Sequence, residues 1–83
     1  MTSFRYRPEI LTQLETHGVR PGGETTPDAA RSVVRDLYNY ELRRLRDRTR
    51  EGKLPRTALA QEVRLLRHKY AILSIPLSEW IDS

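Results

Sequence analysis

Apolar positions recur with the helical period in three stretches of the chain. At 100° per residue, one side of the stretch 27–51 collects Ala30, Val33, Val34, Leu37, Tyr38, Tyr40 and Leu45. The stretch 56–73 has a narrower stripe of Leu59, Val63, Leu66, Tyr70 and Leu73, which is close to the spacing of a coiled-coil seam. The stretch 8–17 offers Ile10, Leu11 and Leu14. This pattern predicts helices near 8–17, 27–51 and 56–73.

Proline and glycine mark the boundaries of these stretches. Prolines stand just ahead of helix-compatible segments at Pro8, Pro27, Pro55 and Pro76, a position that tolerates proline because its missing N–H would have no partner within the helix. Gly18 and Gly52 follow the first two stretches, where a residue of positive φ is wanted. Thr26 is placed to cap the second helix. A short helical turn is expected near 76–81.

The linker Gly52–Pro55 is short, so the helices on either side of it are expected to be antiparallel neighbours. Folding the chain at this linker sets Leu45 near Val63 and Tyr38 near Tyr70, and the two apolar stripes then meet in register. The sequence therefore predicts an all-α fold over residues 1–83. We expect one small three-helix domain built on a long antiparallel helical hairpin, with a short C-terminal helical turn.

Length and composition narrow the class of protein. The chain has 83 residues and no cysteine, so disulfides cannot stabilise its small core. A core of this size rarely supplies more than about 3–5 kcal/mol, which makes self-association the default expectation. The first residues have no apolar run typical of a signal peptide, and no apolar run approaches the roughly 18 residues of a membrane span. We expect a cytoplasmic protein without a membrane segment.

The charge balance suggests an anionic partner without establishing one. The chain has 15 basic and 11 acidic residues, and only Lys53 and Lys69 are lysines. On a helical wheel, one outer side of the second helix gathers the candidate anion-binding residues Arg35, Arg43, Arg46 and Arg50. Such a stripe can follow a phosphate backbone. The competing interpretation, which we favour, is a solvated helix surface with local ion pairs to Asp47 or Glu51.

Glu41 is a carboxylate near the middle of the apolar side of the second helix. Burying it unpaired would cost several kcal/mol, so it must be paired or have a raised pKa. Three interpretations are open: an acid–base group, a device that sets the register of a subunit interface, or an ion pair with Arg44, Arg48 or Arg67. We favour the ion pair.

Large aromatic residues provide candidate contact area for a partner protein. Together with Glu41, the candidate interaction surface comprises Tyr38, Tyr40, Tyr70 and Trp80. Tyr38 and Tyr40 project about 160° apart around the helix, so both cannot enter one narrow seam. Trp80 is expected to fold back over the end of the hairpin near Val33 and Val34.

No catalytic, cofactor-binding or metal-binding motif is present in the sequence. His17 and His68 lack companion ligands at metal-binding spacing, so we predict neither enzyme activity nor a cofactor. The function favoured by the sequence is a non-enzymatic protein–protein interaction module, self-associating and most simply a dimer. The alternative is a small basic nucleic-acid-binding protein that uses the Arg-rich helix side.

Overall fold

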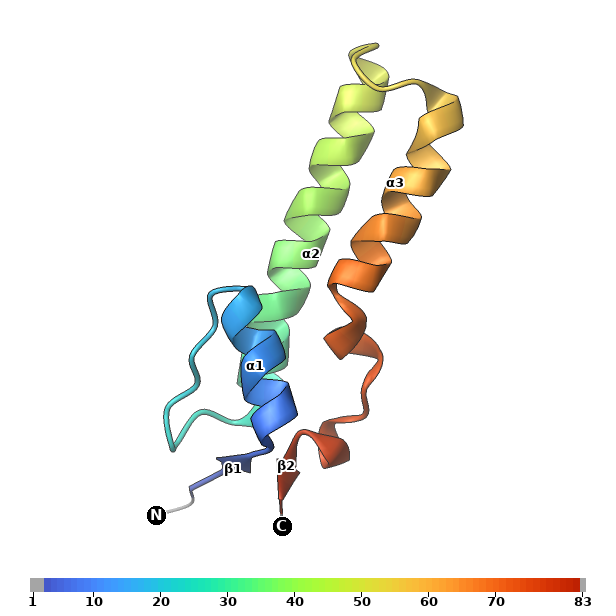
Figure 1. Cartoon of the computed structure of the whole chain (residues 1–83). Helices are drawn as coiled ribbons and strands as arrows, with labels where there is room; N and C mark the ends of the chain where they lie inside the picture. Colours follow the sequence, from blue (N-terminus) through green and yellow to red (C-terminus); the bar gives the residue numbers. More distant parts are fainter. Residues whose placement is uncertain (1–2, 83) are drawn as a thin grey trace. The chain divides into compact units, whose positions relative to one another are not determined.

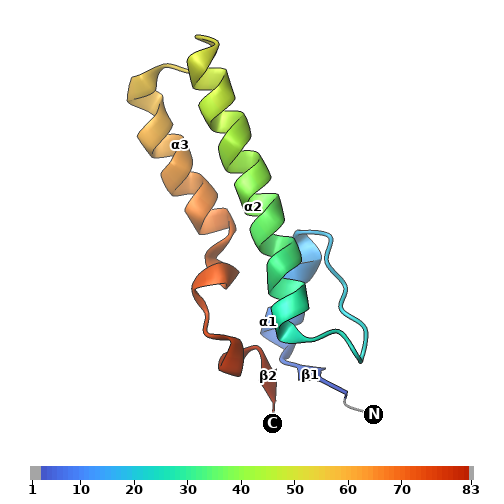
Figure 2. The ribbon, with the colours of Figure 1, turned by 180° about the vertical axis from the view of Figure 1, so that it is seen from behind.

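The fold is helical and is built on a helical hairpin. The computed structural model describes residues 3–82. In chain order its elements are β1 (Arg5–Tyr6), α1 (Pro8–Thr16), α2 (Pro27–Arg50), α3 (Arg56–Lys69), the 3-10 helices η1 (Ala71–Ser74) and η2 (Leu77–Glu79), and β2 (Ile81–Asp82). Helices α2 and α3 lie side by side and run in opposite directions (Figures 1 and 2). The predicted all-α fold with its antiparallel hairpin is confirmed.

The helix boundaries follow the predicted signals. The Thr26 hydroxyl accepts a hydrogen bond from the Ala29 N–H at 3.1 Å, which caps α2. Gly18 and Gly52 have φ values of 75° and 76°. At the end of α2 the Lys53 N–H donates to the Arg48 carbonyl at 2.9 Å. The glycines therefore close α1 and α2 in the left-handed conformation that other residues rarely adopt.

The chain divides into two compact units. The first, here called the core unit, contains the chain up to Arg35 together with the chain from Ile72 onward. The second, the hairpin unit, is Asp36–Ala71. Helix α2 is one continuous element whose first turns belong to the core unit and whose remainder belongs to the hairpin unit. Each unit is described separately below.

The core unit holds most of the buried side chains of the described residues. They are Tyr6, Ile10, Leu14, Ala30, Val34, Ile72 and Trp80. Two of these side chains carry a polar group that is hydrogen-bonded within the unit: the Trp80 indole N–H donates to the Ile75 carbonyl at 3.0 Å, and the Tyr6 hydroxyl donates to the Thr25 carbonyl at 2.6 Å. The core unit therefore has a closed apolar interior.

Two short strands join the ends of the described chain. β1 and β2 pair antiparallel, with Arg5 opposite Asp82 and Tyr6 opposite Ile81. An ion pair between Arg7 Nε and Asp82 Oδ1 at 3.4 Å lies beside them. This pairing was not expected from the sequence, because two-residue strands are too short to show an alternating pattern.

The structure corrects the prediction at two places. Val33 was expected inside with Val34, but Val33 is 49% exposed. The helix expected to reach residue 73 ends at Lys69 and is followed by the 3-10 segment Ala71–Ser74. The tighter 3-10 turn changes the angle between successive side chains. As a result Ile72 is fully buried, whereas Leu73, which the helical stripe predicted as the inward residue, is only partly covered.

The hairpin unit has an open apolar seam. Its buried side chains are only Leu66 and Tyr70, while Leu37, Tyr38, Leu42, Leu45, Leu59 and Val63 are partly exposed. The predicted register is confirmed where Tyr38 meets Tyr70, since their ring centroids are 5.5 Å apart in an edge-to-face arrangement. The apolar stripes of α2 and α3 therefore face each other, but two helices alone leave the edges of both stripes exposed.

Candidate interaction site

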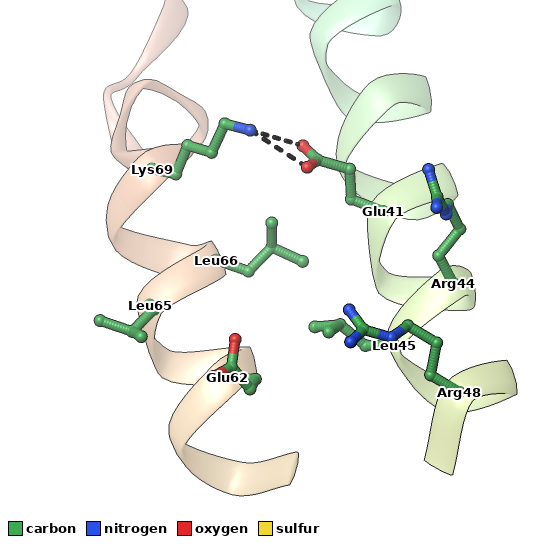
Figure 3. Close-up of a pocket in the computed structure, with 8 residues that line it drawn as sticks. All are labelled: Glu41, Arg44, Leu45, Arg48, Glu62, Leu65, Leu66 and Lys69. Atoms are coloured by element: carbon green, nitrogen blue, oxygen red, sulfur yellow. Dashed lines mark hydrogen bonds and ion pairs between the residues drawn. The ribbon is translucent and has the colours of Figure 1, made fainter. Parts of the chain in front are cut away.

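A carboxylate of α2 connects the two helices of the hairpin unit. Glu41 of α2 accepts hydrogen bonds from the Lys69 ammonium at 3.1 and 3.2 Å, one to each carboxylate oxygen (Figure 3). It also accepts a hydrogen bond from the Tyr70 hydroxyl. The expected ion pair is present, but the cation is Lys69 and not Arg44, Arg48 or Arg67.

The direction of helical side chains explains why Lys69 is the partner. In an α-helix every Cα–Cβ bond leans toward the N-terminus of the helix. Because α2 and α3 are antiparallel, the N-terminal direction of α2 corresponds to the C-terminal direction of α3. Glu41 therefore reaches toward Lys69 and Tyr70 at the end of α3. Register alone, without this lean, would set Glu41 opposite Arg67.

Tyr70 is the buried member of this cluster, with 5% of its surface exposed. Burial, the hydrogen bond to Glu41 and the negative charge of that carboxylate all raise the pKa of Tyr70. The phenol therefore keeps its proton at neutral pH and acts as a hydrogen-bond donor. The Lys69 ammonium also lies 5.7 Å from the centre of the Tyr70 ring. These contacts tie the end of α3 to the middle of α2.

One flank of the hairpin seam forms a groove with charges of both signs, here called the Glu41 groove. Its lining residues are Glu41, Arg44, Leu45, Arg48, Glu62, Leu65, Leu66 and Lys69. In Figure 3, Leu66 points into the space between the helices, whereas Leu65 points away from α2. Leu65 is 53% exposed. This flank thus combines an uncovered leucine with both acidic and basic side chains.

The other flank of the seam forms a second groove, here called the arginine groove. It is lined by Tyr38, Leu42, Arg46, Arg56, Leu59, Ala60, Val63, Arg64 and Arg67, and has a volume of about 560 Å³. Thr49 and Arg50 continue it along α2. No acidic side chain is among these lining residues. The arginine groove is therefore an apolar trough bordered by positive charge from both helices.

The four predicted anion-binding arginines do not all line one groove of the structure. Arg35, Arg43, Arg46 and Arg50 are all exposed. Arg46 and Arg50 line the arginine groove, Arg43 is not among its lining residues, and Arg35 belongs to the core unit.

The α3 arginines of the groove were missed by the sequence analysis. They are Arg56, Arg64 and Arg67. The signal was present, because these three residues fall on one side of α3 on a helical wheel. It becomes visible only when the α3 wheel is aligned with that of α2.

The five residues of the predicted interaction surface do not form one exposed surface. Tyr40 is 56% exposed, with the Arg44 guanidinium 5.9 Å from its ring centre. Tyr38 is partly covered by its contact with Tyr70. Trp80 is fully buried in the core unit, where its N–H is already bonded. The placement of Tyr70 and Trp80 at a surface is therefore corrected, because folding within one chain already buries both side chains.

Other kinds of site find no support in the described part of the chain. Residues 3–82 contain no group of three or more His, Cys, Asp or Glu side chains arranged to hold a metal ion. Within the same residues, no helix has the length and apolar character needed to cross a membrane. No protein-family model matches the chain, and no curated protein or solved structure matches it either. The function of the chain is therefore inferred from the surface of the hairpin unit.

Proposed function

We propose that this chain is a non-enzymatic protein–protein interaction module, with the hairpin unit as its contact region. The observation that supports the proposal is the uneven distribution of buried side chains. Among the residues that the structure describes, the core unit encloses seven apolar or aromatic side chains, whereas the hairpin unit encloses only Leu66 and Tyr70. Apolar area that one chain leaves half covered is available for burial against another chain.

The energy available from this uncovered area is large for a chain of this size. Fully burying one leucine or valine is worth about 1.5–3 kcal/mol. Six seam residues are partly exposed, and Leu65 and Tyr40 are more than half exposed. Covering even half of this area would add several kcal/mol to a domain expected to have only about 3–5 kcal/mol of its own.

We further propose a homodimer formed through the Glu41 groove. A two-fold interface brings the same surface of both copies together, so each charge must find its opposite within that surface. The Glu41 groove meets this requirement, because Glu62 lies on α3 while Arg44 and Arg48 lie on α2. Exposed Leu65 would sit at the centre of the contact. The absence of cysteine fits the reducing cytoplasm, where we propose that the protein acts.

Sedimentation velocity from micromolar to millimolar concentration tests the dimer. The 9.7 kDa chain is expected to approach twice its mass as concentration rises. Leu65→Glu should keep it monomeric, since the new carboxylate would be buried in the interface. Leu11→Glu is the matched control, because Leu11 is 40% exposed but lies on α1. A chain that stays monomeric throughout and captures no partner protein in chemical crosslinking would overturn the proposed function.

The second candidate is a nucleic-acid-binding protein. It is favoured by the concentration of positive charge in the hairpin unit, where ten basic and five acidic residues lie between positions 36 and 71. In that case the chain should bind duplex DNA, and its affinity for the DNA should fall steeply between about 50 and 200 mM salt. Arg43→Glu combined with Arg46→Glu, both at exposed positions of the hairpin unit, should weaken the binding without unfolding the chain. Absence of binding to duplex DNA at low salt would exclude this function.

A further inference from the structure

We infer that the arginine groove binds an acidic amphipathic helix supplied by a different protein. The inference goes beyond the proposed homodimer, which uses the opposite flank of the seam. It depends on three features of the groove: its apolar floor, its uniformly positive border and its length. The floor argues against a nucleic acid, the border argues against a second copy of this chain, and the length sets the size of the occupant.

The floor of the groove is apolar and comes from both helices. Leu42 of α2 and Leu59 and Val63 of α3 line it and are partly exposed. Tyr38 and Leu42 are four residues apart on α2, as are Leu59 and Val63 on α3, so each pair forms a ridge along its helix. Two adjacent ridges of this kind accept a third helix that inserts its own apolar stripe between them. A nucleic acid backbone would leave this apolar floor uncovered.

The border of the groove carries only positive charge. Arg46 and Arg50 project from α2, and Arg56, Arg64 and Arg67 project from α3. The ion pairs found in residues 3–82 involve none of these five arginines. A second copy of this chain placed in the same groove face to face would bring arginine against arginine. Charge complementarity instead requires glutamate or aspartate on either side of the stripe that enters the groove.

The length of the groove sets the minimum length of the occupant. Along α2 its lining residues extend from Tyr38 to Arg50. Twelve steps of 1.5 Å give about 18 Å, or a little over three helical turns. The matching occupant is a helix of about 12–18 residues with leucine-like side chains on one side and acidic side chains beside them.

Binding to designed peptides tests this inference on the full chain. The probe is a fluorescently labelled helical peptide of about 18 residues with leucine at positions i, i+3, i+4 and i+7, glutamate beside the leucines and alanine on the remaining side. One control peptide replaces every glutamate with lysine, and another keeps glutamate but replaces every leucine with serine. Fluorescence anisotropy should show micromolar binding of the first peptide only. Its affinity should decrease about tenfold or more when the salt concentration is raised from about 50 to 200 mM.

Charge-matched variants locate the binding site. Arg56→Glu combined with Arg67→Glu should lower the affinity for the acidic peptide by about tenfold or more. Arg35→Glu combined with Arg43→Glu changes the net charge equally at exposed positions outside the groove, and should alter the affinity less than about threefold. Leu59→Gln should weaken binding while leaving the dependence on salt unchanged. Circular dichroism confirms that each variant is folded.

Three results would overturn the inference. The first is no binding of the acidic peptide at high micromolar protein. The second is an equal loss in both double variants, which would mean non-specific attraction to a positive chain. The third is binding of duplex DNA in competition with the peptide at the same arginines. None of these results bears on the dimer, which is measured separately through Leu65→Glu, so the two proposals can fail independently.

Discussion

Removing the Glu41 carboxylate is expected to destabilise the chain more than removing the hydroxyl that donates to it. In Glu41→Ala, the Tyr70 hydroxyl and the Lys69 ammonium both lose the carboxylate to which they donate. A hydrogen bond to a charged group is worth about 1.5–3 kcal/mol, and a partly exposed ion pair adds about 0–1 kcal/mol. The higher helix propensity of alanine offsets a few tenths of a kcal/mol of this loss in the free energy of unfolding. The expected loss is about 2–3 kcal/mol.

A variant that combines Glu41→Ala with Tyr70→Phe measures how strongly the two side chains stabilise each other. Tyr70→Phe keeps the ring packed against Tyr38 and leaves Glu41 paired with Lys69, so we expect a loss of about 1–2 kcal/mol. Glu41→Ala with Tyr70→Phe should cost no more than Glu41→Ala alone, because the hydroxyl that lost its carboxylate is then absent. The coupling energy from this double-mutant cycle should be about 1–2 kcal/mol.

Urea unfolding followed by far-UV circular dichroism measures these free energies. The control is Glu51→Ala, which removes an exposed ion pair with Lys53 and should change stability by less than about 0.5–1 kcal/mol. Additive single losses, or a Glu41→Ala chain as stable as the Glu51→Ala control, would refute the conclusion that Glu41, Lys69 and Tyr70 hold α2 and α3 together.

Three further predictions follow from the structure. Because the pKa of Tyr70 is raised by folding, the folded chain keeps a proton that the unfolded chain releases near pH 10. Stability is therefore unaffected below that pH and falls by up to about 1.4 kcal/mol per pH unit above it; urea unfolding should show a shallower fall in Tyr70→Phe. Gly52→Ala places a side chain at φ 76° and should cost about 1 kcal/mol in thermal unfolding, whereas Gly23→Ala, with open space around it, should cost less. Ile72→Ala should destabilise the chain by about 2–4 kcal/mol, and Leu73→Ala by clearly less, which a urea titration of both would show.

The helices and their register could be predicted because they depend on local signals that agree with one another. Thr26, Gly18 and Gly52 mark the same helix ends in the sequence and in the structure. The short linker after Gly52 requires an antiparallel partner, and the apolar stripes then fix which residues meet. Tyr38 and Tyr70 meet as predicted because both the linker and the stripe specify that pair.

Features that depend on contacts between distant residues could not be predicted in the same way. The β1–β2 pair joins Tyr6 to Ile81 across nearly the whole chain, and two residues carry no strand pattern. Ile72 is buried where Leu73 was expected, because this segment is a 3-10 helix. A 3-10 helix has three residues per turn and does not keep the α-helical period on which the prediction was based. The sequence placed Trp80 both over the end of the hairpin and among the candidate interface residues, because a large aromatic residue suits either position. The structure decides between the two, since Trp80 is fully buried within its own chain.

The arginine groove also could not be predicted from one helix, because its lining comes from both α2 and α3. Considered on α2 alone, Arg46 and Arg50 belong to a stripe with Arg35 and Arg43, and that stripe resembles a track for phosphate groups. Once α3 lies alongside, Arg46 and Arg50 instead share a groove with the α3 arginines over an apolar floor. The chemistry of the surface is thus a property of two helices, and a wheel drawn for either one cannot show it.

The two flanks of one seam differ in a way that determines what each can bind. Rotation about a two-fold axis places a surface against its own copy, so only a flank with charges of both signs can meet itself without repulsion. The Glu41 groove satisfies this condition through Glu62 and Arg48, whereas the arginine groove contains no acidic residue. Self-association through the first flank leaves the second uncovered. An acidic helix could therefore bind the dimer as well as the monomer, with one site on each copy.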